Sequence, residues 1–576
     1  MSHVVVITLL FNFHSMNTIK NLHPILILLL LLSCSGKKSQ EQFQSELQSI
    51  NLNRGEIALC GSGRDQFGTV NMGLSCAEKV RENFNLATAL LHSFEYAEAE
   101  KVFAKVIDGD PACVMAYWGV AMCNFHPLWS PPTQSDLEKG SKTIALARSL
   151  ERTSARESDY LEAIAAIYDQ WDQLDYRTRT LKFEKAAENI YQKYPDDKEA
   201  AIFYALALRA TADPTDKTFR NQKKAGEILN SVLAEEPNHP GITHYIIHTY
   251  DYPELAELAL PAARKYASIA AASAHAQHMP SHIFTRLGLW DESIQSNITS
   301  ISAAQCYAQN IGIQGHWDEE LHGMDYLMYA YLQKANDDKA KEQLDYLHSI
   351  NEVFPLNFKD AYSIAAIPVR YAVERKHWDE AEKLELDPKF PWENFYWEKA
   401  NIHFGRLLGA VHTRKLETAQ QALQQLRDIH AVLNQRKESY KANQVLIMVK
   451  ASEGWIQFAQ GNKEAALTPM IEAADLEDAT EKDPITPGEV IPARELLGDM
   501  YLEMGQPAKA FEAYELDLKR HPNRFNGLYG AGLAAEKSGN AKNAVLYYKQ
   551  LLSLANSSDN QRPQLQAAEL FVKNNN

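Results

Sequence analysis

The sequence predicts an all-α fold, an α-solenoid of stacked helix pairs. From Phe84 onward apolar residues recur with helical spacing, and strand-like alternation never continues beyond a few residues. A set of glycine, alanine, tyrosine and proline positions also recurs along the chain, and such recurrence is typical of repeat proteins. A single helix pair would leave an apolar face uncovered. Stacking the pairs buries that face, so the repeats favour a solenoid.

The repeat unit is clearest near the C-terminus, in RELLGDMYLEMGQPAKAFEAYELDLKRHP at 494–522. Three of its small residues recur one repeat later, and the second-helix half of the pattern also occurs near the N-terminus. The matching residues are Gly498, Tyr501, Gly505, Ala510, Tyr514 and Pro522, then Gly532, Gly539 and Ala544, with Tyr96, Ala99, Phe103 and Pro111 in the N-terminal copy.

Weaker copies fill the middle of the chain. In each, a small residue allows the second helix of a pair to pack against the first, and irregular spacing of these residues predicts insertions between some repeats. The small residues are Ala225, Ala256, Ser293, Ala340, Ala381, Ala419 and Ala466, and the expected insertions are 211–222, 310–319, 387–393 and 476–490.

This pattern resembles the tetratricopeptide-repeat (TPR) superfamily over roughly residues 80–555. The segments LLHSFEYAEAEKVF, HPGITHYIIHTYD and HMPSHIFTRLGLWDESI are similar to those of an uncharacterised group of bacterial TPR lipoproteins with HPGxxHYxIHxYD and HMPSHIF segments. The resemblance implies a TPR-like superhelix in which the first helix of each pair lines a concave groove. It implies no reaction.

The N-terminus has the pattern of a leader. Lys20 precedes an apolar run at 25–32, which is too short for an ordinary transmembrane helix, and we expect a signal peptide over 1–33 with the true start at Met16. The residues before Cys34 resemble a lipobox, so Cys34 is the expected lipidation site; a leader without lipid is the alternative. Acyl chains would anchor the protein to a membrane of the bacterial cell envelope, at the outer membrane or periplasmic face.

The domain organisation follows from these signals. We expect a lipidated tether at 34–78, the TPR-like solenoid at 79–560 and a C-terminal tail at 561–576. Export favours disulfides, and either Cys60–Cys76 or Cys76–Cys113 is a plausible pair. Cys123 and Cys306 lie in apolar helical patterns, which favours buried thiols.

The net charge of the chain indicates which class of partner it binds. The formal net charge is −16 and no block of Lys and Arg relieves it, so nucleic-acid binding is disfavoured. A protein or peptide partner, held in the groove, fits a TPR-like surface better.

Histidines are concentrated between residues 238 and 294, which hold six of the nineteen. A helix starting at Pro240 would place His244, His248 and Asp251 on one face. The next histidine segment interrupts its own helix at Pro280, by a new start or a kink. Counting from the small residues places both segments, and a third face at 322–329, on the groove side. The candidate metal ligands are His244, His248, Asp251, His275, His278, His282, His322 and Asp325.

Three interpretations of this cluster remain open. Neutral imidazoles with Asp oxygens suit a transition metal such as zinc, copper or iron. A metal-free polar pocket for a peptide or small ligand is the second interpretation, and a hydrogen-bonded network between helices is the third. Candidate ligand-binding residues around the groove are His126, Tyr329 and Arg370.

No recognised catalytic motif supports an enzyme. The first histidine pair reads HYIIH, without the glutamate of the HExxH zinc proteases. A metal with an open position could still activate water, with Asp251 or Asp325 as the base. We therefore expect a binding scaffold, with a metal-dependent hydrolytic or oxidative enzyme as the alternative.

Overall fold

The computed structural model describes residues 40–58, 60, 64–128, 131–151, 153–556 and 562–575. The chain divides into two compact units, residues 1–49 and residues 50–576. In the first unit the described part is α1, Gln40–Ser49; the leader and the expected lipidation site Cys34 lie outside the described residues. Among the described helices, none has the length and apolarity needed to cross a membrane.

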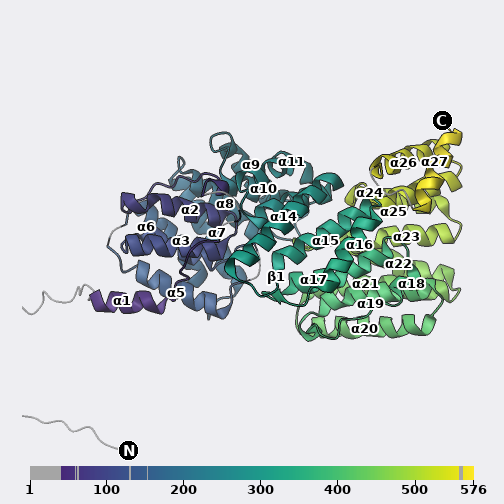
Figure 1. The fold of residues 1–576 in the computed structure, drawn as a ribbon, viewed down its shortest axis with the longest axis horizontal. Coiled ribbons are helices and arrows are strands. Elements are labelled where there is room, and N and C mark those ends of the chain that lie inside the picture. The colour runs from purple at the N-terminus through teal and green to yellow at the C-terminus, as the bar shows by residue number, and fades with distance from the viewer. Residues whose placement is uncertain are drawn as a thin grey trace, which may run out of the picture. The chain divides into compact units, whose positions relative to one another are not determined.

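The second unit consists almost entirely of helix pairs, which follow one another from α2 to α26 in Figure 1. The all-α solenoid predicted from the sequence is therefore confirmed. The helices of its first half are α2 Arg81–His92, α3 Tyr96–Gly109, α4 Val114–Cys123, α5 Gln134–Ala147, α6 Ala155–Tyr168, α7 Tyr176–Lys193, α8 Lys198–Ala210, α9 Arg220–Leu233, α10 Pro240–Tyr250, α11 Ala256–Ile269, α12 Ala274–His278, α13 Pro280–Arg286 and α14 Trp290–Ile311.

The second half continues the same arrangement. Short 3-10 helices lie at Arg64–Phe67, Glu78–Val80 and Trp392–Asn394. The remaining helices are α15 Asp318–Gln333, α16 Asp337–Ser349, α17 Phe358–Val373, α18 Trp378–Ala381, α19 Tyr396–His412, α20 Leu416–Gln435, α21 Ser439–Ala459, α22 Lys463–Ala479, α23 Ala493–Glu503, α24 Pro507–Arg520, α25 Phe525–Lys537, α26 Ala541–Leu554 and α27 Pro563–Asn575.

One register recurs in eight of the described pairs. Two residues before the second helix, the backbone adopts a positive φ; this residue is glycine in four pairs, where the conformation is least costly. The fourth residue of the second helix is alanine or serine with no exposed surface. The turn residues are Phe94, Gly288, Ala335, Lys376, Arg414, Gly461, Gly505 and Gly539, and the small residues are Ala99, Ser293, Ala340, Ala381, Ala419, Ala466, Ala510 and Ala544.

Close packing explains the glycines inside the helices. A Cβ atom on Gly498 would lie 2.8 Å from the ring of Tyr514, and one on Gly532 would lie 2.5 Å from the ring of Tyr548. These tyrosines lie in the second helices α24 and α26. The repeat signature therefore encodes the contact between the two helices of each pair.

Of the expected insertions, 387–393 lies wholly between two α-helices, whereas 211–222, 310–319 and 476–490 each overlap the end of a helix. From α2 onward, the longest connections join α18 to α19 and α22 to α23. A third insertion contains β1, His316–Trp317, which pairs in parallel with β2, Val353–Phe354.

The superhelix closes on itself at two places in the second unit. The first helices of successive pairs pack side by side, as α15, α17, α19 and α21 do. Helix α2 also contacts α10, and α15 contacts α25, although many helices separate the members of each pair in the sequence. Each closure brings buried polar side chains from distant repeats together.

Residues from Ile50 onward belong to the packed unit and are not only a tether. Ile50, Phe67 and Met72 are buried, and the amide of Thr69 donates to the carbonyl of Asn238 at 3.0 Å. The expected tail at 561–576 also differs: most of it forms α27, where Leu565, whose side chain is buried, packs on the last pair. An apolar stripe on this helix covers the face that a final repeat would leave open.

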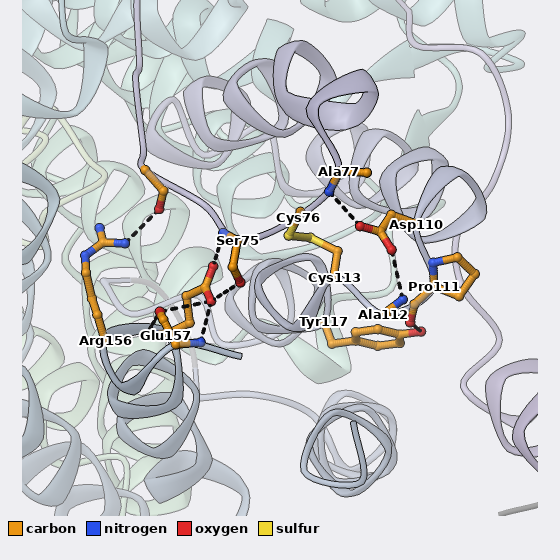
Figure 2. The surroundings of a disulfide bond; sticks show 12 residues. Ser75, Cys76, Ala77, Asp110, Pro111, Ala112, Cys113, Tyr117, Arg156 and Glu157 are labelled. Atoms are coloured by element: carbon orange, nitrogen blue, oxygen red, sulfur yellow. Dashed lines mark hydrogen bonds between the residues drawn. A yellow bond between two sulfur atoms is a disulfide. The ribbon is translucent and has the colours of Figure 1, made fainter. Parts of the chain in front are cut away.

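Two disulfides tie the N-terminal part of the second unit. Cys76–Cys113 is one of the two pairs proposed from the sequence, and Figure 2 shows the segment beside it held by hydrogen bonds. There the amide of Ala77 donates to Asp110 at 2.7 Å and the amide of Ser75 donates to Glu157 at 2.8 Å.

The second disulfide differs from the expectation. Cys306 was expected to be a buried thiol, but it pairs with Cys60 across a sequence separation of 246 residues. Sequence spacing could not reveal this pair because the superhelix creates the proximity. Cys123 is a free, buried cysteine, as expected.

Candidate metal centre

The histidine cluster is built on consecutive first helices of the repeats. Helix α10 begins at Pro240, as predicted, and carries His244 and His248. Helix α12 ends at His278 and α13 begins at Pro280. Met279 between them keeps helical dihedral angles, so the break shifts the axis without turning the chain away.

Three imidazoles form the first histidine triad, which consists of His244, His248 and His275. The Nε2 atom of His244 lies 3.1 Å from Nε2 of His248 and 3.2 Å from Nε2 of His275. The Nδ1 atom of His244 lies 2.6 Å from the carbonyl oxygen of His92. Because a carbonyl accepts only, Nδ1 of His244 carries the proton and its Nε2 presents a lone pair to the other two rings.

The second histidine triad consists of His278, His282 and His322. The Nε2 atoms of His278 and His282 are 3.0 Å apart. Nδ1 of His278 donates to the side-chain oxygen of Asn297 at 2.8 Å, and Nδ1 of His282 donates to Asp251 at 3.1 Å. Both facing Nε2 atoms therefore present lone pairs to each other, an arrangement that two neutral rings do not stabilise.

A cation between the two nitrogens would resolve this conflict. Within each triad, one ligand atom from each residue lies within 4.8 Å of the others. Zinc–nitrogen bonds of about 2.0–2.1 Å place neighbouring donors of a tetrahedron about 3.3–3.4 Å apart, close to the separations found here. Hydrogen bonds on the far nitrogens, which fix the ring tautomers, are the usual outer support of histidine ligands.

Protons do not compete well for these nitrogens. Burial lowers the pKa of His244, His248, His278 and His322 well below the ordinary value, and neighbouring histidines lower each further. Burial lowers the pKa of His275 to about 3. The rings are therefore neutral near pH 7, which is the form that binds a metal.

The two candidate aspartates do not join the donor sets. Asp251 accepts from Nε of Arg286 at 2.8 Å, lies 3.3 Å from Lys482, and orients His282 from behind. Burial alone would raise the pKa of Asp251, but the two cations hold it well below its usual range. Asp325 pairs with Arg370 at 3.1 Å. Neither carboxylate is available as the water-activating base proposed from the sequence.

The other candidate ligand-binding residues are also engaged. Arg370 is fully buried and donates to Asp325 and to two backbone carbonyls of the 480–492 loop. The hydroxyl of Tyr329 accepts from Arg524 at 2.7 Å. His126 is half-buried, and its ring packs on Tyr96 at 4.6 Å between centroids. These residues belong to the packing of the repeats around the histidines.

Sequence reasoning missed four residues around the first triad, namely His92, Phe94, Glu199 and His239. The rings of His92 and His239 each place Nε2 2.9 Å from an oxygen of Glu199, which forms a third buried group. His92 also supplies the carbonyl that orients His244. Phe94 occupies the turn position that is glycine in other repeats, and its ring centroid lies 4.4 Å from that of His244.

The sequence singled out the segment that contains two of these residues, but it did not indicate that they lie beside the histidines. His92 and Phe94 lie in LLHSFEY, a segment that carried the family resemblance. Their role becomes visible only because α2 contacts α10.

Solvent reaches both triads at their edges. His248 and His275 are each 8% exposed and His322 is 6% exposed, whereas His244 has no exposed surface. The triads are thus largely dry sites whose rims touch water.

Comparisons with known proteins found only distant structural likenesses. No family model matches the sequence, and no curated protein matches it. The human IFIT1 dimer with m7Gppp-AAAA is 14% identical, with 81% of this chain and 95% of that chain covered and a TM-score of 0.33. The Naa15/Naa10 structure bound to HypK-THB is 12% identical, with 93% and 94% covered and a TM-score of 0.23.

Scores this low carry no argument about either fold or function. The class of the protein follows from its own helix pairs and their shared register: it is a TPR-like α-solenoid. Two buried histidine triads distinguish its first helices.

Proposed function

We propose that this protein is a metal-binding TPR-like scaffold, in which the histidine triads hold a transition metal. One observation carries the proposal: the Nε2 atoms of His278 and His282 face each other at 3.0 Å while hydrogen bonds fix the protons of both rings on Nδ1. A purely structural network would instead pair each donor with an acceptor.

Metal content tests the proposal. Purified protein equilibrated with Zn²⁺ or with copper, then desalted, is expected to retain at least about one ion per chain by elemental analysis. The double variant His244→Ala/His282→Ala removes a donor from each triad and is expected to retain less than a tenth of that amount.

The matched control replaces two exposed histidines, His348→Ala/His377→Ala, and should retain the wild-type content. A wild-type protein that binds no metal would refute the proposal and favour the metal-free pocket or the structural network.

A metal-dependent enzyme is the second candidate. Each triad supplies three protein donors, and three-donor sites leave a position for water or substrate. The measurement is the visible spectrum of the Co²⁺-loaded protein with added azide. A spectral change that saturates with azide would support an open position, and an unchanged spectrum would argue for a closed, structural ion.

The anchor and the location complete the proposal. The lipobox-like segment supports acylation of Cys34, attachment to a membrane of the bacterial cell envelope, and a protein or peptide partner near that surface. Cells that express Cys34→Ser with a labelled fatty acid are expected to yield unlabelled, soluble protein, whereas the wild type is labelled and membrane-bound. Label in the variant, or none in the wild type, contradicts the anchor.

A further inference from the structure

We infer that the histidine cluster holds two metal ions, one in each triad, and that the pair of ions is monovalent copper. This inference rests on the proposed function and extends it. It concerns the number of ions and their charge, which the proposal of metal binding leaves open.

The number of donors argues against a single ion. A tetrahedral ion takes four donors, but the two triads together present six imidazoles. Each triad is compact, with its donor atoms within 4.8 Å of one another. Between the triads, the ring centroids of His248 and His282 are 6.5 Å apart, only slightly more than the 6.1 Å between His248 and His275 inside the first triad. The case for two ions therefore rests on the number of donors and on the short Nε2 distances within each triad.

Two histidines of the same short helix belong to different triads. His275 and His278 are three residues apart on α12, yet His275 faces His244 and His278 faces His282. Helix α13 begins again at Pro280 and returns His282 to within 3.0 Å of His278. The backbone thus directs two sets of donors to two points.

The two sites have separate outer supports. The His92 carbonyl orients the first triad through His244, and Asn297 and Asp251 orient the second through His278 and His282. Asp251 is already shared with Arg286 and Lys482. Because these supports do not overlap, one triad can lose its ion while the other keeps its geometry.

Charge selects the ion. The donors are all imidazole nitrogens, which suit zinc, copper, iron or nickel and do not favour Mg²⁺ or Ca²⁺. Two ions held in neighbouring triads repel each other in a poorly screened interior. The repulsion between two monovalent ions is about fourfold smaller than that between two divalent ions. The nearby cations of Arg286 and Lys482 further disfavour a pair of divalent ions. Monovalent copper is the ion of this class with a single charge.

Anaerobic titration tests the inference. The full chain is titrated with Cu⁺ against a colorimetric Cu⁺ chelator, and in parallel with Zn²⁺. We expect two Cu⁺ and one Zn²⁺ per chain. In the variants His244→Ala/His248→Ala and His278→Ala/His282→Ala, we expect one Cu⁺ each.

The outcomes separate the two claims. Binding of no metal refutes the proposed function itself. One Cu⁺ per wild-type chain, lost in either double variant, shows a single shared site and refutes the inference alone. Two Zn²⁺ per chain refutes the assignment to a monovalent ion.

Folding is controlled in two ways. The single variants His248→Gln and His278→Gln keep a polar side chain and should each also bind one Cu⁺ where a double variant does not fold. His348→Ala/His377→Ala should bind two.

Discussion

The two closures of the superhelix hold opposite kinds of polar cluster. Where α15 meets α25, Arg524 lies 2.9 Å from Glu495 and 2.8 Å from Glu374, so that each charge faces an opposite charge. Where α2 meets α10, the first histidine triad consists of neutral imidazoles whose lone pairs converge. The first cluster is complete within the protein and holds the repeats together. The second consists of neutral rings that provide no opposite charge of their own.

The largest expected effect comes from breaking the complete cluster. Arg524→Met leaves Glu495 and Glu374 buried without their cation, because Arg524 has no exposed surface. We expect a loss of about 3–5 kcal/mol in the free energy of unfolding, measured in denaturant.

A surface arginine provides the control. The side chain of Arg148 is 37% exposed and pairs with Glu162 and Asp169, so Arg148→Met should cost less than about 1 kcal/mol. Equal losses in the two variants would show that the buried network does not hold this closure.

A smaller effect on stability is expected at His521, three residues before Arg524, and this effect depends on pH. Burial alone would lower the pKa of His521, but Asp517 and Glu489 outweigh it and raise this pKa to about 10. Because the pKa is raised on folding, the stabilisation is complete below the unfolded value of about 6.5 and is lost as the pH rises through about 10.

The measurement compares His521→Gln with the wild type across this range. At pH 6 the variant should be less stable by about 1.5–3 kcal/mol, and the difference should shrink toward zero above pH 10. A difference that grows with pH would mean that His521 is neutral in the folded protein.

The smallest effect is expected in the histidine cluster without metal. Among the hydrogen bonds of the described residues, none involves the side chain of His322, and this residue is 6% exposed. His322→Leu in metal-free protein should therefore change the free energy of unfolding by no more than about 1 kcal/mol, since an unpaired buried polar group is replaced by an apolar one of similar size.

With metal present, His322→Leu tests whether the second triad is a metal site or a structural network. Saturating metal should raise the midpoint of thermal unfolding of the wild type, and His322→Leu should show a smaller rise. A large loss of stability without metal would instead indicate that the cluster is a structural network, like that of Arg524.

Local signals were sufficient for the fold but not for the whole site. Gly505 and Ala510 identify the turn and the close contact of a helix pair, because these demands are set within one repeat. The break at Pro280 was also readable, since proline removes a backbone donor. The pairing of His92 with Glu199 could not be predicted, because it joins α2 to α8 across 107 residues of sequence. Asp251 and Asp325 were assigned as ligands because sequence alone could not reveal Arg286 and Arg370 as their partners.

The Cys76–Cys113 disulfide makes the first histidine triad depend on the redox state of the compartment in which the chain folds. Its 37-residue loop encloses both α2 and α3, and with them Phe94 and the His92 carbonyl that orients His244. A chain matured under oxidising conditions therefore has the wall behind its first triad fastened covalently. A chain made in a reducing compartment must hold that wall by packing alone, so preparations from the two sources should differ in how well they retain metal.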